Sequence, residues 1–199
     1  MAINREKIIE DMSKIQVVGD KNGIIDGFGV FVNQLPSDFW IGFSEKLVGS
    51  VDNEIIDATE ALLVNAAQEC GYHTGYGIIT CEEWKAVVQP MVENVEDVLH
   101  GAFAILTAWG WANSEIVELI PGEKLVVRAH DYYEADVVMK GKSSMFKAYM
   151  VKGICAAFMA LAYSGEYSVK GEKVNDFTCK QTKGIECGDA YGEFIVLKA

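Results

Sequence analysis

The feature of this sequence that most limits its fold is a change of hydrophobic period near residue 113. Before that point, from about residue 50 to residue 110, apolar side chains recur at helical spacing. The stretch SEIVELIPGEKLVVRAHDYYEADVV that follows alternates with a period of two, and Pro121-Gly122 divides it with a turn. The chain is therefore predicted to form a helical first half followed by a pair of adjacent strands.

The helical half contains two predicted helices. The first begins near Ser50 and stops at Gly71, because glycine is the usual residue just beyond a helix end. The second begins with Thr80 as its N-cap and ends at Gly110, and Pro90 marks a kink or a helix start within it.

Shorter elements precede and follow these helices. Residues 3–17 predict an amphipathic helix, 30–32 a strand, and 37–48 a helix. After the strand pair, residues 143–165 predict a heavily buried helix, capped by Ser143 or Ser144, and 173–197 a final strand pair. Because the strands are grouped and do not alternate with helices, the predicted fold class is α+β, with helices packed on an antiparallel sheet.

Charge and composition exclude several classes of partner. The chain of 199 residues carries a formal net charge of −12, so it lacks the basic residues that bind nucleic acid or anionic lipid. The N-terminus has no apolar signal-peptide core, and the longest apolar run, 148–163, is shorter than the roughly 20 residues of a membrane span. Five cysteines without regular spacing fit a reducing compartment, so we expect a cytoplasmic protein with no nucleic-acid or membrane partner.

Two polar stretches are candidates for acid–base chemistry. RAHDYYEAD places His130 beside Asp131, a pairing that suits proton transfer but also suits the solvated face of an edge strand. GYHTGYG carries His73 between glycines, and it fits either the lip of a pocket or a plain connection between helices.

The C-terminal stretch DFTCKQTKGIECGDAYGEF combines two cysteines with nearby carboxylates. Asp176, Cys179 and Cys187 are the residue types that bind zinc, although a tetrahedral site needs four ligands and no Cys-x-x-Cys pair is present. Half a metal site, a disulfide and an ordinary hairpin with two cysteines all remain open at this point.

Four segments carry a family resemblance: AWGWANSEIVEL, KLVVRAHDYYEA, AYMVKGICAAFMALAYSGE and DFTCKQTKGIECGDAYGEFIV. Together they resemble the 4-vinyl reductase domain family, a small-molecule or hydrocarbon-binding family related to haem-NO-binding and TRAPP-type folds. The resemblance covers residues 50–199 and implies that they form a ligand-binding domain, with 1–49 as an N-terminal helix and strand extension. It also implies a homodimer, because the related folds pair through helices.

The resemblance bears on the metal question. In zinc-carrying members it implies ligands at an acidic residue and a cysteine of the first closing strand, a cysteine after a Gly-Asp pair, and a cysteine where the buried helix starts. Asp176 and Cys179 match the first two, whereas Gly192 and Ala148 stand at the other two. We therefore expect no bound metal and no other cofactor, and Asp176, Cys179 and Cys187 are the remaining metal candidates.

The function that follows is the binding of a small, largely apolar or aromatic molecule in an internal pocket between the helices and the sheet. One alternative is a small enzyme (reductase, hydrolase or lyase) that uses His130, Asp131 or His73 as acid–base groups. A second alternative is a protein-interaction module. The candidate ligand-binding residues, each of which also fits plain core packing, are Trp84, Phe103, Trp109, His130, Tyr132, Phe146 and Tyr149.

Overall fold

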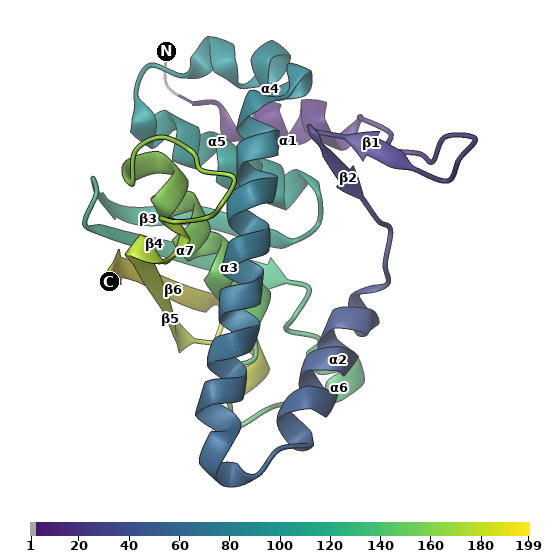
Figure 1. Cartoon of the computed structure of the whole chain (residues 1–199), viewed down its shortest axis with the longest axis vertical. Coiled ribbons are helices and arrows are strands. Elements are labelled where there is room, and N and C mark those ends of the chain that lie inside the picture. Colours follow the sequence, from purple (N-terminus) through teal and green to yellow (C-terminus); the bar gives the residue numbers. More distant parts are fainter. Residues whose placement is uncertain (1–2) are drawn as a thin grey trace.

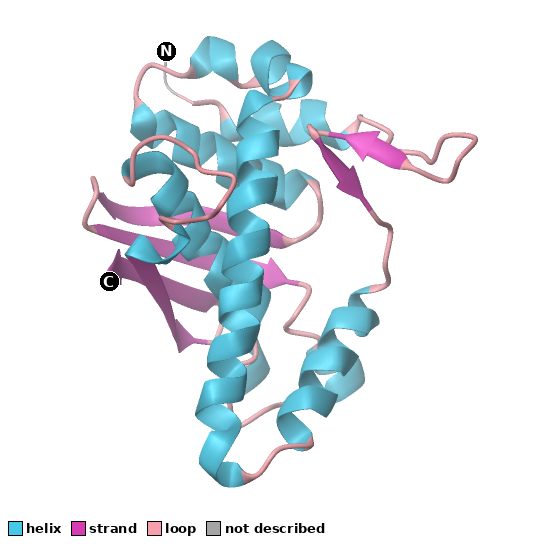
Figure 2. Cartoon of the chain, viewed as in Figure 1, coloured by secondary structure: helices cyan, strands magenta, loops and turns pink. Residues whose placement is uncertain are grey.

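A four-stranded antiparallel sheet forms one layer of the molecule. The computed structural model describes residues 3–199, apart from the side chains of residues 138 and 139, and places the strands in the order β3-β4-β6-β5. The strand bounds are β3 Ala112–Ile120, β4 Lys124–Tyr132, β5 Phe177–Lys183 and β6 Gly192–Lys198. Figure 2 shows these strands gathered on one side of the helices. The predicted α+β class and both predicted strand pairs are confirmed.

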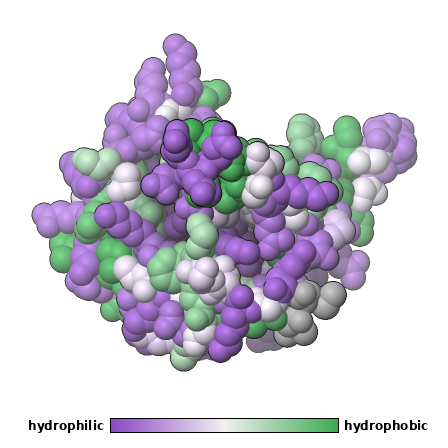
Figure 3. Space-filling model, turned by 90° about the horizontal axis from the view of Figure 1, so that it is seen from below, coloured by the Kyte–Doolittle hydropathy of each residue, from purple (hydrophilic) through white to green (hydrophobic). Residues whose placement is uncertain are grey.

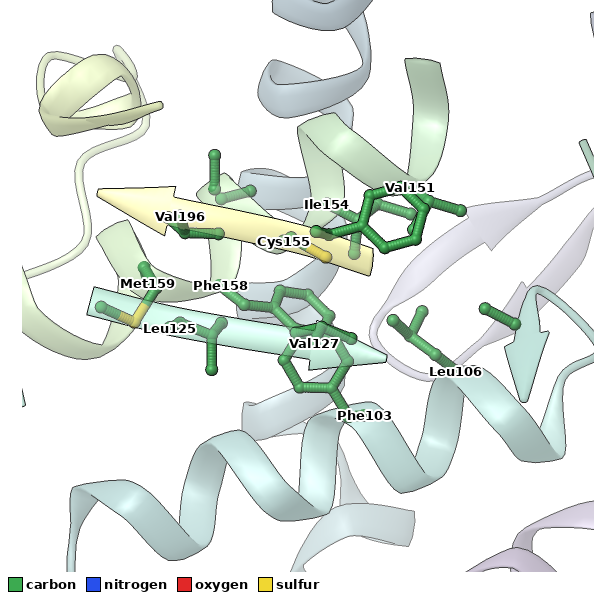
Figure 4. Packing of buried hydrophobic residues seen from close by; sticks show 14 of the residues in the cluster. Phe103, Leu106, Leu125, Val127, Val151, Ile154, Cys155, Phe158, Met159 and Val196 are labelled. Atoms are coloured by element: carbon green, nitrogen blue, oxygen red, sulfur yellow. The ribbon is translucent and has the colours of Figure 1, made fainter. Parts of the chain in front are cut away.

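Helices are stacked in two layers on one face of this sheet. Helix α7 (Tyr149–Tyr163) lies against the strands, and the long helix α3 (Ile56–Thr80) packs on the other side of α7 (Figure 1). A Cβ atom built on Gly153 of α7 would lie 2.5 Å from the backbone nitrogen of Gln68, so the two helices can approach this closely only at a glycine. Helix α5 (Val95–Ala108) adds Phe103 and Leu106 to the same core (Figure 4).

The alternation of buried and exposed side chains along β4 shifts by one residue at a β-bulge. Its odd-numbered residues from Leu125 to Ala129 are fully buried, as the alternation predicts. The register against β3 then slips by one residue, so that His130 is an extra residue in β4. Because the bulge reverses the alternation, Tyr132 returns to the buried face, whereas His130 stays exposed.

The predicted end of a helix at Gly71 is wrong, because α3 continues through GYHTGYG to Thr80. The glycines of this stretch face neighbouring elements. A Cβ atom on Gly75 would lie 2.8 Å from the ring of Phe158 in α7. The packing gained there outweighs the roughly 1 kcal/mol by which glycine disfavours a helix. A glycine can end a helix or allow a neighbouring element to pack closely, and the sequence alone does not show which of the two it does.

The predicted helix between Thr80 and Gly110 is divided near Pro90. The chain forms α4 (Glu82–Val87), the 3-10 turn η2 (Gln89–Met91) and then α5. Cys81 caps α4 in place of the predicted Thr80, and Asn94 caps α5. Gly110 follows the end of α5 with a φ of 73°, as its position predicted.

The first 49 residues form α1 (Arg5–Ser13), a hairpin of β1 (Ile25–Gly27) and β2 (Val30–Val32), and α2 (Ser37–Gly49). The sequence predicted α1, β2 and α2. Helix α1 packs against α5, and the Arg5 guanidinium donates to the carbonyl oxygen of Ser114 at 3.0 Å. The hairpin and α2 lie to the right of α3 in Figure 1, and the turn of residues 20–24 before β1 projects outward. In the β1–β2 turn itself, Phe28 is buried against Trp109. The turn η1 (Asn53–Ile55) leads from α2 into α3.

Three short elements complete the fold: α6 (Val137–Lys140), η3 (Val174–Asp176) and η4 (Ile185–Cys187). Helix α7 begins at Tyr149, later than the start predicted at Ser143 or Ser144. The Ser143 backbone N–H donates to the carbonyl oxygen of Glu186, so this segment is held against η4 and is not wound into the helix. Within residues 3–199, no helix combines the length and the apolar character needed to cross a membrane.

Candidate functional site

An aromatic cleft of about 420 Å³ lies between α2, the β2–α2 connection and the α5–β3 turn. Four parts of the chain that are distant in sequence contribute to it: residues 33–40, 109–111, 133 and 150. This volume falls within the range of pockets that hold small molecules. The apolar and aromatic walls of the cleft come mainly from Leu35, Phe39, Trp40, Trp109, Trp111 and Tyr133.

Local geometry places two tryptophans at the cleft. Gly110 adopts a left-handed conformation that turns the chain sharply between α5 and β3, so the residues on both sides of it line the same cleft. Trp109 packs on Phe28 of the hairpin with ring centroids 4.0 Å apart. Trp111 meets Tyr133 edge to face at 6.0 Å, and the Tyr133 N–H donates to the Trp111 carbonyl.

Two of the cleft tryptophans, Trp40 and Trp109, differ in the hydrogen bonding of their indole N–H groups. The Trp40 Nε1 donates to the carboxylate of Glu134 at 2.9 Å. The Trp109 Nε1 is buried, and it has no hydrogen-bond partner among residues 3–199. An unpaired buried donor costs about 1–3 kcal/mol, so the indole of this cleft residue carries an unsatisfied hydrogen-bond donor.

Glu134 is a buried carboxylate directly beside the cleft. It accepts hydrogen bonds from the backbone N–H groups of Met150 and Val151 and from Trp40. Burial raises its pKa from 4.5 to about 7, although these three hydrogen bonds oppose the shift. Burial and the nearby Glu134 charge also raise the pKa of Tyr133, whose hydroxyl therefore stays protonated at neutral pH.

A narrow apolar crevice of about 20 Å³ adjoins the cleft and shares Trp109 and Trp111 with it. Its other walls come from Gly71, Thr74 and Gly75 of α3, together with neighbouring residues of α5 and α7. Because these glycines have no side chains, the backbone of α3 lines the crevice directly. The crevice therefore lies where the glycines allow α3 and α7 to pack closely.

The structure distributes the predicted ligand-binding residues widely. Trp109 lines the cleft. Trp84 is buried in a second core beneath α1, where its Nε1 donates to Gln89, and Phe103 packs on Phe158 in the main core. Phe146 is half-buried before α7.

The remaining predicted ligand-binding residues also lie apart from the cleft. The Tyr132 hydroxyl is buried and donates to Glu186. Tyr149 lines a separate hollow of about 280 Å³ beside α2, and its hydroxyl donates to Glu60 at 2.6 Å. His130 is exposed on the outer face of the sheet, 2.9 Å from Glu115.

The predicted acid–base candidates are not brought together. His73 lies on α3, where its Nδ1 is 2.8 Å from the Tyr167 hydroxyl and its Nε2 is 3.4 Å from Glu69. Asp131 is exposed at the β-bulge beside His130, on a different element from His73.

The predicted metal candidates lie along the final hairpin. Asp176 belongs to η3, the half-buried Cys179 to β5, and Cys187 to η4. In the described part of the chain, no three His, Cys, Asp or Glu residues are grouped so that they could hold a metal ion. Cys179 instead neighbours Cys155 of α7, and burial followed by this contact raises the pKa of the Cys155 thiol.

Sequence reasoning missed most of the cleft. Phe39 and Trp40 come from the N-terminal extension, to which no role was assigned, and Tyr133 and Glu134 follow the strand that drew attention to His130. The runs DFW and YYE did signal a local concentration of aromatic residues. Nothing in either run shows that the two segments meet, because their pairing depends on how α2 folds back beside α7.

Comparisons with known proteins establish the fold. No family model matches the sequence, and no curated protein matches it either. The structure is similar to the phenol-responsive sensory domain of the transcription activator PoxR, solved with phenol. That match has a TM-score of 0.71 at 12% identity, and it covers 100% of this chain and 92% of the other.

A second similar structure is a trafficking protein particle complex subunit 3 from Naegleria fowleri, covalently bound to palmitic acid. Here the TM-score is 0.54 at 12% identity, with 82% of this chain and 95% of the other covered. At such low identity the two matches show a shared fold and no more. The predicted relation to TRAPP-type folds is thereby confirmed, while membership of the 4-vinyl reductase family stays a prediction.

Proposed function

We propose that this chain binds a small aromatic molecule with a hydroxyl group, of the phenol class, in the cleft lined by Trp40, Trp109, Trp111 and Tyr133. The observation that carries the proposal is the aromatic cleft, one of whose wall residues, Trp109, has a buried Nε1 without a partner among the described residues. A phenol would place its ring among aromatic walls and its oxygen against this donor. The phenol-bound PoxR domain, which has the same fold, supports the choice of ligand class.

The proposal includes the N-terminal extension in the ligand-binding unit. Leu35, Phe39 and Trp40 supply one wall of the cleft, so residues 50–199 alone would leave it open on that side. The PoxR likeness also extends over the whole chain. We therefore treat 1–49 and 50–199 as one functional unit.

Isothermal titration of the purified chain with phenol tests the proposal. We expect one phenol site per chain, and we expect benzene, which has no oxygen for the Trp109 N–H, to bind about fivefold more weakly, corresponding to about 1 kcal/mol. Failure of phenol and of methylphenols to bind at millimolar concentration would contradict the proposal.

A second candidate function, protein–protein interaction, is favoured by one observation. Phe31 of β2 is 78% exposed and Val18, in the segment before β1, is 72% exposed. The face seen from below in Figure 3 is by contrast mostly hydrophilic, with hydrophobic residues in small groups. A dimer formed through these side chains would bury them, and light scattering of wild type and of Phe31→Ser tests whether they mediate self-association.

A further inference from the structure

A single carboxylate joins three separate parts of the fold beside the aromatic cleft. Helix α7 has Ala148 at its N-cap, and this residue offers no side-chain acceptor to the first N–H groups of the helix. Glu134, from the segment after β4, supplies the acceptor and takes bonds from Met150 N–H at 2.9 Å and Val151 N–H at 3.0 Å. The oxygen that binds Met150 also accepts the Trp40 indole N–H of α2.

Helix α2 is otherwise lightly packed, because most of its apolar side chains are half-buried or exposed. Only Ile41 and Ser44 of this helix are fully buried, and Phe39 and Phe43 are 59% and 49% exposed. The Glu45 carboxylate pairs with Lys147 at 3.2 Å and Lys140 at 3.7 Å, both partly exposed ion pairs of the kind that stabilise little. An element with few buried apolar contacts opens at low free-energy cost.

We propose that α2 is a lid on the aromatic cleft and that Glu134 is the positioning residue that latches it through the Trp40 indole. This inference rests on the proposed function, because the cleft is its ligand site. Trp40 both lines the cleft and carries the latch hydrogen bond, so a ligand that packs on Trp40 favours the latched lid. By reciprocity, the latched lid raises the affinity for that ligand to the same degree.

The burial of Glu134 and the groups around it determine how the stability of the latched state changes with pH. The titratable and charged groups that face it are Glu45, Tyr133, Asp136, Lys140, Lys147, Tyr149, Lys152 and Glu186. Burial outweighs the hydrogen bonds and raises the pKa of Glu134 to about 7. Opening the lid hydrates the carboxylate and returns its pKa toward 4.5, so a falling pH favours the latched state.

Hydrogen–deuterium exchange of residues 37–49 tests the latch in the ligand-free chain. Trp40→Phe keeps a ring in the cleft but removes the indole donor, and we expect exchange in α2 to become about fivefold faster, the effect of one hydrogen bond. In the wild type, exchange corrected for its intrinsic pH dependence should slow as the pH falls from about 8 to about 6. Glu134→Gln, which is always neutral, should lose this pH dependence and keep α7 folded.

Trp109→Phe is the matched control, because it alters the cleft without touching the latch. We expect it to weaken phenol binding and to leave ligand-free exchange of α2 unchanged. Added phenol should slow α2 exchange in the wild type more than in Trp40→Phe. Equal exchange of α2 in wild type and Trp40→Phe would overturn the latch even if phenol binds, whereas altered exchange without phenol binding would support the latch and overturn the proposed function.

Discussion

At the scale of single residues, two tryptophans of the cleft differ in whether their indole N–H groups donate a hydrogen bond. Trp40 has a partner in Glu134, and Trp109 has none among the described residues. Native interiors seldom leave a buried donor unpaired, so the second indole is the more informative of the two. Under the proposed function, this donor is the one that the oxygen of a phenol would satisfy.

Trp109→Phe is expected to weaken phenol binding by about fivefold, since it removes one donor while keeping an aromatic ring on Phe28. Titration calorimetry measures the affinity. His130→Ala is the comparison, because His130 is exposed on the sheet and absent from the cleft, and its affinity should match wild type. Similar losses in both variants would place the phenol site elsewhere.

Glu134 is expected to make stability depend on pH. Its pKa is about 7 in the folded chain against 4.5 ordinarily, so between these values the folded state holds a proton that the unfolded state has lost. The free energy of unfolding should therefore fall as the pH rises from about 4.5 to about 7. Urea unfolding of wild type and Glu134→Gln at several pH values measures this, and the same slope in both proteins would assign the dependence to another group.

At the scale of elements, close approach between helices decides the layout. Gly153 of α7 sits on Ala67 and Gln68 of α3, and Gly75 of α3 faces Phe158 of α7. These glycines are used for contact and not for chain reversal. The same close packing creates the narrow crevice that adjoins the aromatic cleft.

Gly153→Ala is expected to destabilise the fold by roughly 1–3 kcal/mol, because the new methyl group would lie 2.6 Å from the Ala67 Cβ. Gly42→Ala in α2 is the matched control. A Cβ atom there meets nothing within 4 Å, so it should stabilise by roughly 0.5–1 kcal/mol through helix propensity. Chemical denaturation measures both, and equal effects would mean that α3 and α7 can move apart without cost.

A carboxylate network holds the final hairpin, in the region where the metal candidates Asp176, Cys179 and Cys187 lie. The buried Glu186 accepts from the Tyr132 hydroxyl, from Gln181 at 2.8 Å and from the Lys147 backbone N–H at 3.0 Å. These bonds join the first closing strand, the turn and the chain before the buried helix.

A chelator should therefore leave the melting temperature unchanged. Heating the chain with and without excess EDTA is the measurement, and Glu186→Gln, which weakens the network, should lower the melting temperature in both conditions. A fall caused by EDTA together with about one zinc per chain by metal analysis would show that Cys179 and its neighbours hold a metal after all.

At the scale of the whole molecule, α1, the hairpin and α2 of the N-terminal extension each contact the rest of the chain. Arg5 reaches Ser114 of β3, the hairpin places Phe28 on Trp109, and α2 reaches Glu134. A Cβ atom on Gly29 would lie 2.8 Å from the Gly77 carbonyl oxygen, so the hairpin is seated closely on α3. The aromatic cleft lies where these two parts meet.

Phenol is expected to stabilise the whole chain by mass action. At 100 times its dissociation constant a ligand that binds only the folded state adds about 2.7 kcal/mol to the free energy of unfolding. Thermal unfolding should show a single transition that moves upward with phenol. Two transitions, of which only one responds, would mean that the extension unfolds independently of the ligand-binding part.

The sequence by itself determined the features that depend on neighbours along the chain. The turn at Pro121-Gly122, the alternation from Leu125 to Ala129 and the end of α5 at Gly110 follow from local backbone preference and from one buried face. They yielded the α+β class and both strand pairs. Local preference is set within a few residues, so a single sequence is sufficient to read it.

Only the tertiary structure decided the course of α3 beyond Gly71, the bulge at His130 and the composition of the cleft. Gly71 stays helical because α7 packs on it, and Tyr132 faces inward because β3 and β4 slip by one residue. The cleft draws on segments more than 60 residues apart, Trp40 and Trp109 among them. Contacts of that kind are selected by the packing of the whole chain, and no local pattern records them.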